Sequence, residues 1–189
     1  GTINTSNDAI SFGAITLGAN TIIDTNATTT TGDITLGAVT GGGFTLTIET
    51  GNGIAAADVN GTTVSNVSTL TIQNMGGTAT FTGALATITT LTTGATTANL
   101  AFTGNGNIIT NSWTPANTGT LTLGQSGGTQ TYNGGINTAS VGSTVTLNGS
   151  IKTSNDVLTL GAITLGSNTT LDTDATTTTG DITLGAVTG

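Results

Sequence analysis

GTINTSNDAISFGAITLGANTIIDTNATTTTGDITLGAVTG, residues 1–41, is the stretch that decides how the chain folds. A second copy, GSIKTSNDVLTLGAITLGSNTTLDTDATTTTGDITLGAVTG, occupies residues 149–189 and aligns with the first without a gap. The two copies are identical at 31 of 41 positions, and differences such as Ile10/Leu158 and Ile23/Leu171 keep an aliphatic side chain. Repetition at a fixed offset is typical of repeat architectures. We therefore predict one continuous solenoid over residues 1–189, with one full repeat at 1–148, named here the long repeat, and the start of the next at 149–189.

A shorter period lies inside the long repeat. Strand-like segments such as TLTIET (45–50), TLTIQN (69–74) and TVTLNG (144–149) alternate apolar residues with polar ones. The matching apolar residues are spaced evenly, except for one double step between the third and the fourth that we interpret as two turns; they are Ile23, Ile48, Ile72, Leu123, Leu147 and Leu171. Such spacing predicts a solenoid with six coils of about 24–25 residues in each long repeat.

The local pattern favours strands throughout. Alternation with period two indicates half-buried strands, and no segment shows the i, i+3, i+4 spacing of a helix. Phrases such as FTGAL (81–85) and YNGGI (132–136) place Gly between strands, where a residue without Cβ allows a sharp bend. A left-handed solenoid with a period of about 18 residues does not fit. We predict an all-β fold, a right-handed parallel β-helix (β-solenoid).

The composition limits the partners of the chain. Charged residues make up only 5% of it, with one basic residue, nine acidic ones and a net charge of −8, against a usual charged share of about 25%. Like charges stacked along a ladder repel, which explains their scarcity in a solenoid. Without cations to neutralise phosphates, we expect no binding to nucleic acid. No apolar run reaches the ~18 residues of a membrane-spanning helix, so no membrane insertion is expected.

The chemistry of the side chains argues against catalysis. The sequence contains no His, no Cys and no Arg, which removes Ser-His-Asp sets, metal-imidazole sites and thiolate sites. We expect no enzyme activity and no cofactor.

Acidic residues recur once per coil and have two interpretations. Asp8, Asp33 and Asp58 are evenly spaced by one predicted coil each, and Asp156 and Asp181 repeat the first two. Stacked carboxylates could form a Ca²⁺ ladder, since hard cations bind clustered oxygen ligands. Alternatively, each Asp accepts a hydrogen bond from a backbone N–H at a turn, and this second interpretation is favoured. Asp24 and Glu49 form another step of the same kind.

Thr-x-Thr pairs form a second candidate surface. Stacked coils would align Thr45/Thr47, Thr69/Thr71, Thr120/Thr122 and Thr144/Thr146 as two columns. Such an array is similar to the ice-binding face of antifreeze solenoids, although Thr is also an ordinary outward residue of any strand.

Trp113 and Pro115 lie in NIITNSWTPANTG (107–119), inside the double step. Pro cannot donate a hydrogen bond to a central ladder, so a loop is predicted here. Trp113 is then either a loop aromatic packed on the side of the solenoid or a lateral contact that recurs once per long repeat.

The phrases GTQTYNGGI (128–136), STVTLNGSIKTSNDVLTLGAITLGSNTTLDT (143–173) and TTTTGDITLGAV (28–39) resemble the β-strand repeats of filamentous-haemagglutinin-like and autotransporter-like bacterial surface proteins. This resemblance covers nearly the whole chain. It implies a right-handed β-helix, secretion across the outer membrane, and a stalk or fibre used in adhesion, biofilm formation or cell contact. It also implies an extracellular location on the bacterial cell surface.

We therefore expect a structural segment of a long extracellular filament or adhesin stalk. Its partners would be adjacent repeats, through coil-on-coil stacking, and other fibres or a host cell surface. Two alternatives stay open: an ice-binding solenoid with a Thr-x-Thr face, and a short subunit that polymerises head to tail.

Overall fold

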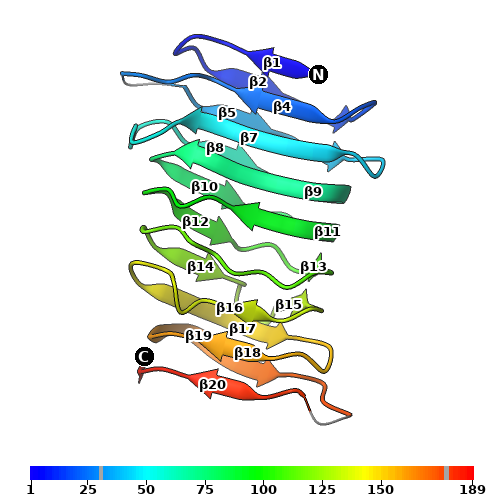
Figure 1. Ribbon diagram of the computed structural model, residues 1–189, viewed down its shortest axis with the longest axis vertical. Coiled ribbons are helices and arrows are strands. Elements are labelled where there is room, and N and C mark those ends of the chain that lie inside the picture. Colours follow the sequence, from blue (N-terminus) through cyan, green and yellow to red (C-terminus); the bar gives the residue numbers. More distant parts are fainter. Residues whose placement is uncertain (30–31, 177–178) are drawn as a thin grey trace.

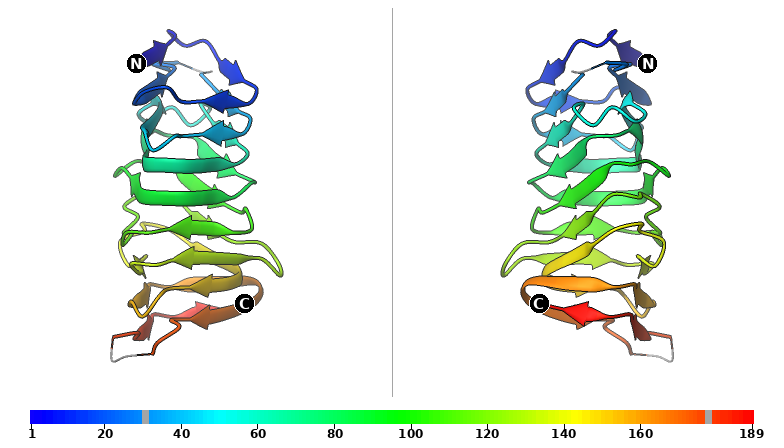
Figure 2. Two further views of the ribbon diagram at one scale, coloured as in Figure 1. Left: turned by 90° about the vertical axis from the view of Figure 1, so that its right-hand side faces the viewer. Right: turned by 90° about the vertical axis from the view of Figure 1, so that its left-hand side faces the viewer.

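The computed structural model is an elongated stack of about eight coils with the two ends of the chain at opposite ends of the stack (Figure 1). It describes residues 1–29, 32–176 and 179–189, which form 21 strands and no helix. Every pairing between these strands is parallel, and each coil pairs with the coil before it and the coil after it. The predicted β-solenoid is confirmed, and Figure 2 shows the same stack from two sides.

Each coil visits three ladders, which we name faces 1, 2 and 3 in the order of the chain. Face 1 contains β2 (Ile10–Phe12), β5 (Ile34–Leu36), β8 (Val59–Gly61), β10 (Thr78–Phe81), β12 (Asn99–Phe102), β14 (Leu121–Leu123) and β21 (Val187–Thr188). Face 2 contains β3 (Ile15–Thr16), β6 (Val39–Thr40), β13 (Asn107–Ile109) and β15 (Thr129–Tyr132). Face 3 contains β1 (Thr2–Asn4), β4 (Thr21–Asp24), β7 (Thr45–Gly51), β16 (Ile136–Asn137), β18 (Leu158–Leu160) and β20 (Ile182–Leu184).

Four long strands bend across a corner and belong to two faces each. β9 (Val64–Met75) and β11 (Leu85–Thr93) run from face 2 to face 3, while β17 (Val145–Lys152) and β19 (Ile163–Asp172) run from face 1 to face 2. On face 3 a single parallel bridge joins Trp113 to Ile136 of β16, and β16, β18 and β20 form a separate sheet.

The alternation in the sequence sets the inside and the outside of the coil. In β17, buried and half-buried residues alternate over the whole strand, with Val145, Leu147 and Ile151 inside. Successive side chains of a strand point to opposite sides of the sheet, so every second residue enters the core. The core is one continuous column of stacked aliphatic side chains that includes four aromatic rings at its centre.

The coils are not of uniform length, which differs from the even spacing predicted. Going up the face 1 ladder, the residue numbers of successive register partners increase by 24, 25, 20, 21, 21, 24, 18 and 24; the partners are Ile10, Ile34, Val59, Ala79, Leu100, Leu121, Val145, Ile163 and Val187. The first two coils match the prediction. The following coil shortens because the corner from face 3 to face 1 is four positions longer between Ile48 and Val59 than between Ile72 and Ala79.

Because the coils shorten, the apolar residues that the sequence aligned do not form a single column. Ile23, Ile48 and Ile72 are register partners on face 3, as predicted. Leu123 and Leu147 are also partners of each other, but they lie on face 1. Leu147 pairs with Leu165, whereas Leu171 pairs with Ile151 on face 2. The phrases TLTI and TLTL look alike because any strand of this solenoid has the same inside–outside pattern, whichever face it occupies.

The two sequence copies consequently lie on different faces. Ile10 is on face 1, but its equivalent Leu158 pairs with Ile136 on face 3. Between Ile10 and Leu158 the chain returns to face 1 six times and then continues through face 2 to face 3. The long repeat therefore contains six and two-thirds coils, in place of the six predicted.

Candidate functional site

The acidic column predicted from the sequence is only partly assembled. Asp33 and Asp58 lie side by side, because the adjoining residues Ile34 and Val59 are register partners. Asp8 is offset by one position from this pair, because the pairing of Ile10 with Ile34 sets Ala9 beside Asp33. Asp156 and Asp181 are out of step in the same way, because Leu158 pairs with Ile182.

The two adjacent carboxylates bind backbone. One Asp33 oxygen accepts a hydrogen bond from the Asp58 N–H at 2.9 Å, and one Asp58 oxygen accepts from the Thr78 N–H at 2.6 Å. This is the turn-capping role that the sequence favoured. Among the described residues, no group of three or more acidic side chains lies close enough to hold a metal ion.

Asp24 and Glu49 are register partners on face 3, and the next position of the ladder is Gln73. The Gln73 amide donates a hydrogen bond to Glu49, and the Asn26 N–H donates to Asp24 at 2.8 Å. With Asn52 and Asn74, several of these residues line an open surface cleft of about 260 Å³. Amide and backbone donors thus bind the two carboxylates that the ladder brings together.

Trp113 is the centre of the core, which corrects both interpretations made from the sequence. Its side chain is 1% exposed, so it cannot make a lateral contact. The ring lies 5.7 Å from Tyr132, stacked at 18°, and 5.6 Å from Phe102. Phe81 continues this group at 5.9 Å from Phe102. Pro115 lies outside the strands, as predicted, but it is buried as well.

A buried amide accompanies the aromatic rings. The Tyr132 hydroxyl donates to the Gln130 side chain at 2.8 Å, and the Gln130 amide donates to the carbonyl groups of Phe102 and Gly104. Burial raises the pKa of Tyr132 far above its usual value. The signal that could have identified Gln130 is the alternation in TQTY (129–132), which places it on the same side of the strand as Tyr132.

Thr side chains form two separate ladders, in place of the single array predicted. The face 3 ladder stacks Thr45, Thr69 and Thr90 in one column and Thr47, Thr71 and Thr92 in the other. The face 1 ladder stacks Thr122, Thr146, Thr164 and Thr188. In both ladders the hydroxyl-bearing side chains are half-buried or exposed on the outer surface.

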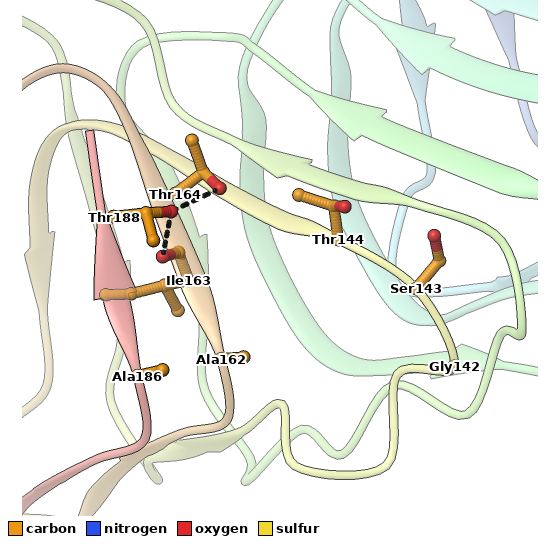
Figure 3. Close-up of a pocket in the computed structure, with 8 residues that line it drawn as sticks. All are labelled: Gly142, Ser143, Thr144, Ala162, Ile163, Thr164, Ala186 and Thr188. Atoms are coloured by element: carbon orange, nitrogen blue, oxygen red, sulfur yellow. Dashed lines mark hydrogen bonds between the residues drawn. The ribbon is translucent and has the colours of Figure 1, made fainter.

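The face 1 ladder ends at a shallow cleft of about 340 Å³ (Figure 3). Small side chains line it, chiefly Ala162, Ala186, Thr144 and Thr164. The Thr164 and Thr188 hydroxyls are 3.1 Å apart, and Thr188 also donates to the Ile163 carbonyl at 3.3 Å. None of the described residues that line the cleft is titratable, so its surface offers hydroxyl and methyl groups rather than acid–base chemistry.

Comparison with known proteins returns no match: no family model fits the chain, and no curated protein or solved structure is significantly similar to it. No helix of the described residues has the length and apolar character needed to cross a membrane. The function is therefore proposed from the geometry together with the resemblance of the sequence phrases.

Proposed function

We propose that this chain is a structural segment of a long extracellular filament or adhesin stalk on a bacterial cell surface. The observation that carries the proposal is that the two sequence copies rebuild the same local contacts. A unit that folds identically wherever it recurs is suited to a tandem array.

The equivalent contacts agree closely in the two copies. They comprise Thr5 N to Asp24 O and Thr153 N to Asp172 O, both 3.0 Å; Thr5 Oγ1 to Asp8 O and Thr153 Oγ1 to Asp156 O, both 2.5 Å; and Thr25 Oγ1 to Gly32 O at 2.6 Å and Thr173 Oγ1 to Gly180 O at 2.8 Å. The strand registers also repeat, with Ile3 opposite Ile23 and Ile151 opposite Leu171.

The mechanical basis is the backbone ladder. Successive coils are joined by parallel strand pairs, and the core between them is continuous. Coils stack about 4.8 Å apart, so each added coil lengthens the rod by that distance. The sparse charge and the outward Thr residues give such a rod a weakly charged, hydroxyl-rich coat.

The native polypeptide tests this proposal directly. Antibodies raised against residues 1–189 should detect, under denaturing conditions, a polypeptide several times heavier than 18.3 kDa. The same antibodies should label intact cells. A band near 18.3 kDa would instead favour short subunits that polymerise head to tail, and labelling confined to lysed cells would contradict the extracellular location.

An ice-binding surface is the second candidate, and the Thr ladder of face 3 favours it. Three ranks of paired Thr residues form a regular array there. Thermal hysteresis of the purified chain, compared with a variant carrying Thr47→Lys, Thr71→Lys and Thr92→Lys, measures this activity. Equal hysteresis in the two proteins would exclude the array as an ice-binding face.

A further inference from the structure

We propose that consecutive long repeats are turned by one face relative to each other, so that each surface feature is presented on all three sides of the rod in turn. The inference rests on the proposed function, because it concerns an array of repeats. The rotation itself is a property of the register within residues 1–189.

All three faces show the same displacement. Ile10 lies on face 1 and its equivalent Leu158 on face 3. Ile15 lies on face 2 and its equivalent Ile163 on face 1, where it pairs with Val145. Ile23 lies on face 3 and its equivalent Leu171 on face 2, opposite Ile151. Each equivalent residue has moved one face backwards relative to the direction of winding.

The segment between the copies causes the rotation. Inside the copies the strand pairs are equivalent: Ile10 pairs with Ile34 and Leu158 with Ile182, across coils of equal length. Residues 42–148 contain the shorter coils, such as those that join Val59 to Ala79 and Ala79 to Leu100. The shortest coil of all follows, from Leu147 to Leu165. Because these coils are shorter, the long repeat passes through two more faces than the six coils predicted from the sequence would.

The consequence is a surface that repeats along a screw. At about 4.8 Å per coil, six and two-thirds coils advance the chain by roughly 32 Å. Three repeats then restore the starting face after twenty coils, or roughly 96 Å. The face 3 Thr ladder of one repeat would be followed by its equivalent on face 2 and then on face 1.

The screw also sets where the face 3 Thr ladder of each repeat lies. On face 3 the ladder extends over three coils, with Thr47, Thr71 and Thr92 in one column. The patch measures roughly 10 Å along the rod. Successive long repeats would therefore present this patch on different sides of the rod.

Cysteine cross-linking tests the register, and the natural chain contains no cysteine to interfere. Register partners in a parallel sheet lie about 4.8 Å apart, within the Cα separation of about 4.4–6.8 Å that a disulfide accepts. The pairs Thr71→Cys with Thr92→Cys and Thr146→Cys with Thr164→Cys are register partners here. Their matched controls, Thr71→Cys with Ala95→Cys and Thr146→Cys with Thr170→Cys, would be partners if every coil had the uniform length predicted from the sequence.

The first two pairs should form disulfides at least tenfold faster than in the urea-unfolded chain, and the control pairs should not. Circular dichroism confirms that each variant is folded before oxidation. Fast oxidation of the control pairs, or no acceleration of the first two pairs, would overturn the rotation. A native polypeptide of only 18.3 kDa would remove the array while leaving these cross-links unchanged, so the two proposals fail separately.

Discussion

At the scale of single residues, the buried pair of Tyr132 and Gln130 is the least expected feature of the core. A hydroxyl and an amide lie at the centre of an apolar column, and each is paired. Buried polar groups are tolerated when they are hydrogen-bonded and are costly when a partner is removed. The free energy of unfolding should therefore depend on the ionisation of Tyr132 at alkaline pH and on the presence of its hydroxyl group.

Alkaline pH should destabilise the fold through Tyr132. Burial raises the pKa of its hydroxyl, so below the unfolded value of about 10 both states are neutral and stability is unaffected. Above that pH the unfolded chain loses the proton while the folded chain retains it. Stability should then fall by about 1.4 kcal/mol per pH unit. Urea unfolding at pH 8–11.5 measures the slope.

Tyr132→Phe is the matched variant for this prediction. It should remove most of the alkaline slope and cost about 1–3 kcal/mol at pH 7, because the Gln130 oxygen loses its donor. Lys152, whose pKa the hydrogen-bonded Asp172 carboxylate raises, is present in both proteins and contributes equally to their slopes. An unchanged slope in the variant would show that Tyr132 is not the group responsible.

Trp113 should be a major contributor to stability. Its ring is 1% exposed and packs against Tyr132 and Phe102, so Trp113→Ala should cost about 3–5 kcal/mol in the free energy of unfolding. Ile108→Ala, at a site 38% exposed, serves as the control and should cost much less. A loss below about 1 kcal/mol for Trp113→Ala, the size of an average substitution, would contradict the central position of the ring.

At the scale of single elements, the corners are fixed by residues that tolerate positive φ. Asn7 and Asn26 have φ of 67° and 46°, and their equivalents Asn155 and Asp174 have 62° and 52°. Asn and Asp adopt this conformation more readily than other side chains. The turns of the two copies therefore recur because the sequence repeats at these positions, even where Asn is replaced by Asp.

Glycine corners should differ in their tolerance of a methyl group. Gly124 has φ of +80°, and a Cβ there would lie 2.0 Å from the Asn148 carbonyl oxygen in the next coil. Gly106 has φ of +85°, but a Cβ added there would have no atom within 4 Å. Gly106→Ala should cost about 1–2 kcal/mol from backbone strain alone.

Gly124→Ala should cost about 2 kcal/mol more than Gly106→Ala, because the coils must separate locally. Thermal or urea unfolding of the two variants measures the difference. Equal losses of unfolding free energy would mean that contact with the next coil does not restrict the side chain at position 124.

At the scale of the whole molecule, the ladders should protect the backbone from proteases. The sequence has a single trypsin site, after Lys152. That residue lies in β17, with Thr131 of one coil and Asp172 of another as its register partners. Cleavage requires these coils to separate.

Trypsin should therefore cut the native chain at least 100-fold more slowly than a synthetic peptide of residues 145–160. A factor of 100 corresponds to about 2.7 kcal/mol of opening free energy. Gel analysis of the 1–152 product over time gives the rate. Comparable rates for chain and peptide would show that the coils beyond Lys152 are open in solution.

Sequence patterns alone account for the β-solenoid, the parallel stacking of like residues and the inside and outside positions. Those properties are local: period-two alternation and Gly or Asn corners act within one coil, and residues 1–41 and 149–189 repeat them. The same reasoning predicted backbone capping for the Asp residues, and Asp33 and Asp58 make such bonds.

The register between coils, in contrast, depends on tertiary packing. Any strand of the solenoid carries the same alternation, so TLTI at 45–48 and TLTL at 120–123 could be aligned on one face although they lie on two. The length of each corner fixes which strands meet, and corner lengths depend on packing against the neighbouring coil. That packing placed Trp113 in the core, divided the Thr residues into two ladders, and turned the second copy by one face relative to the first.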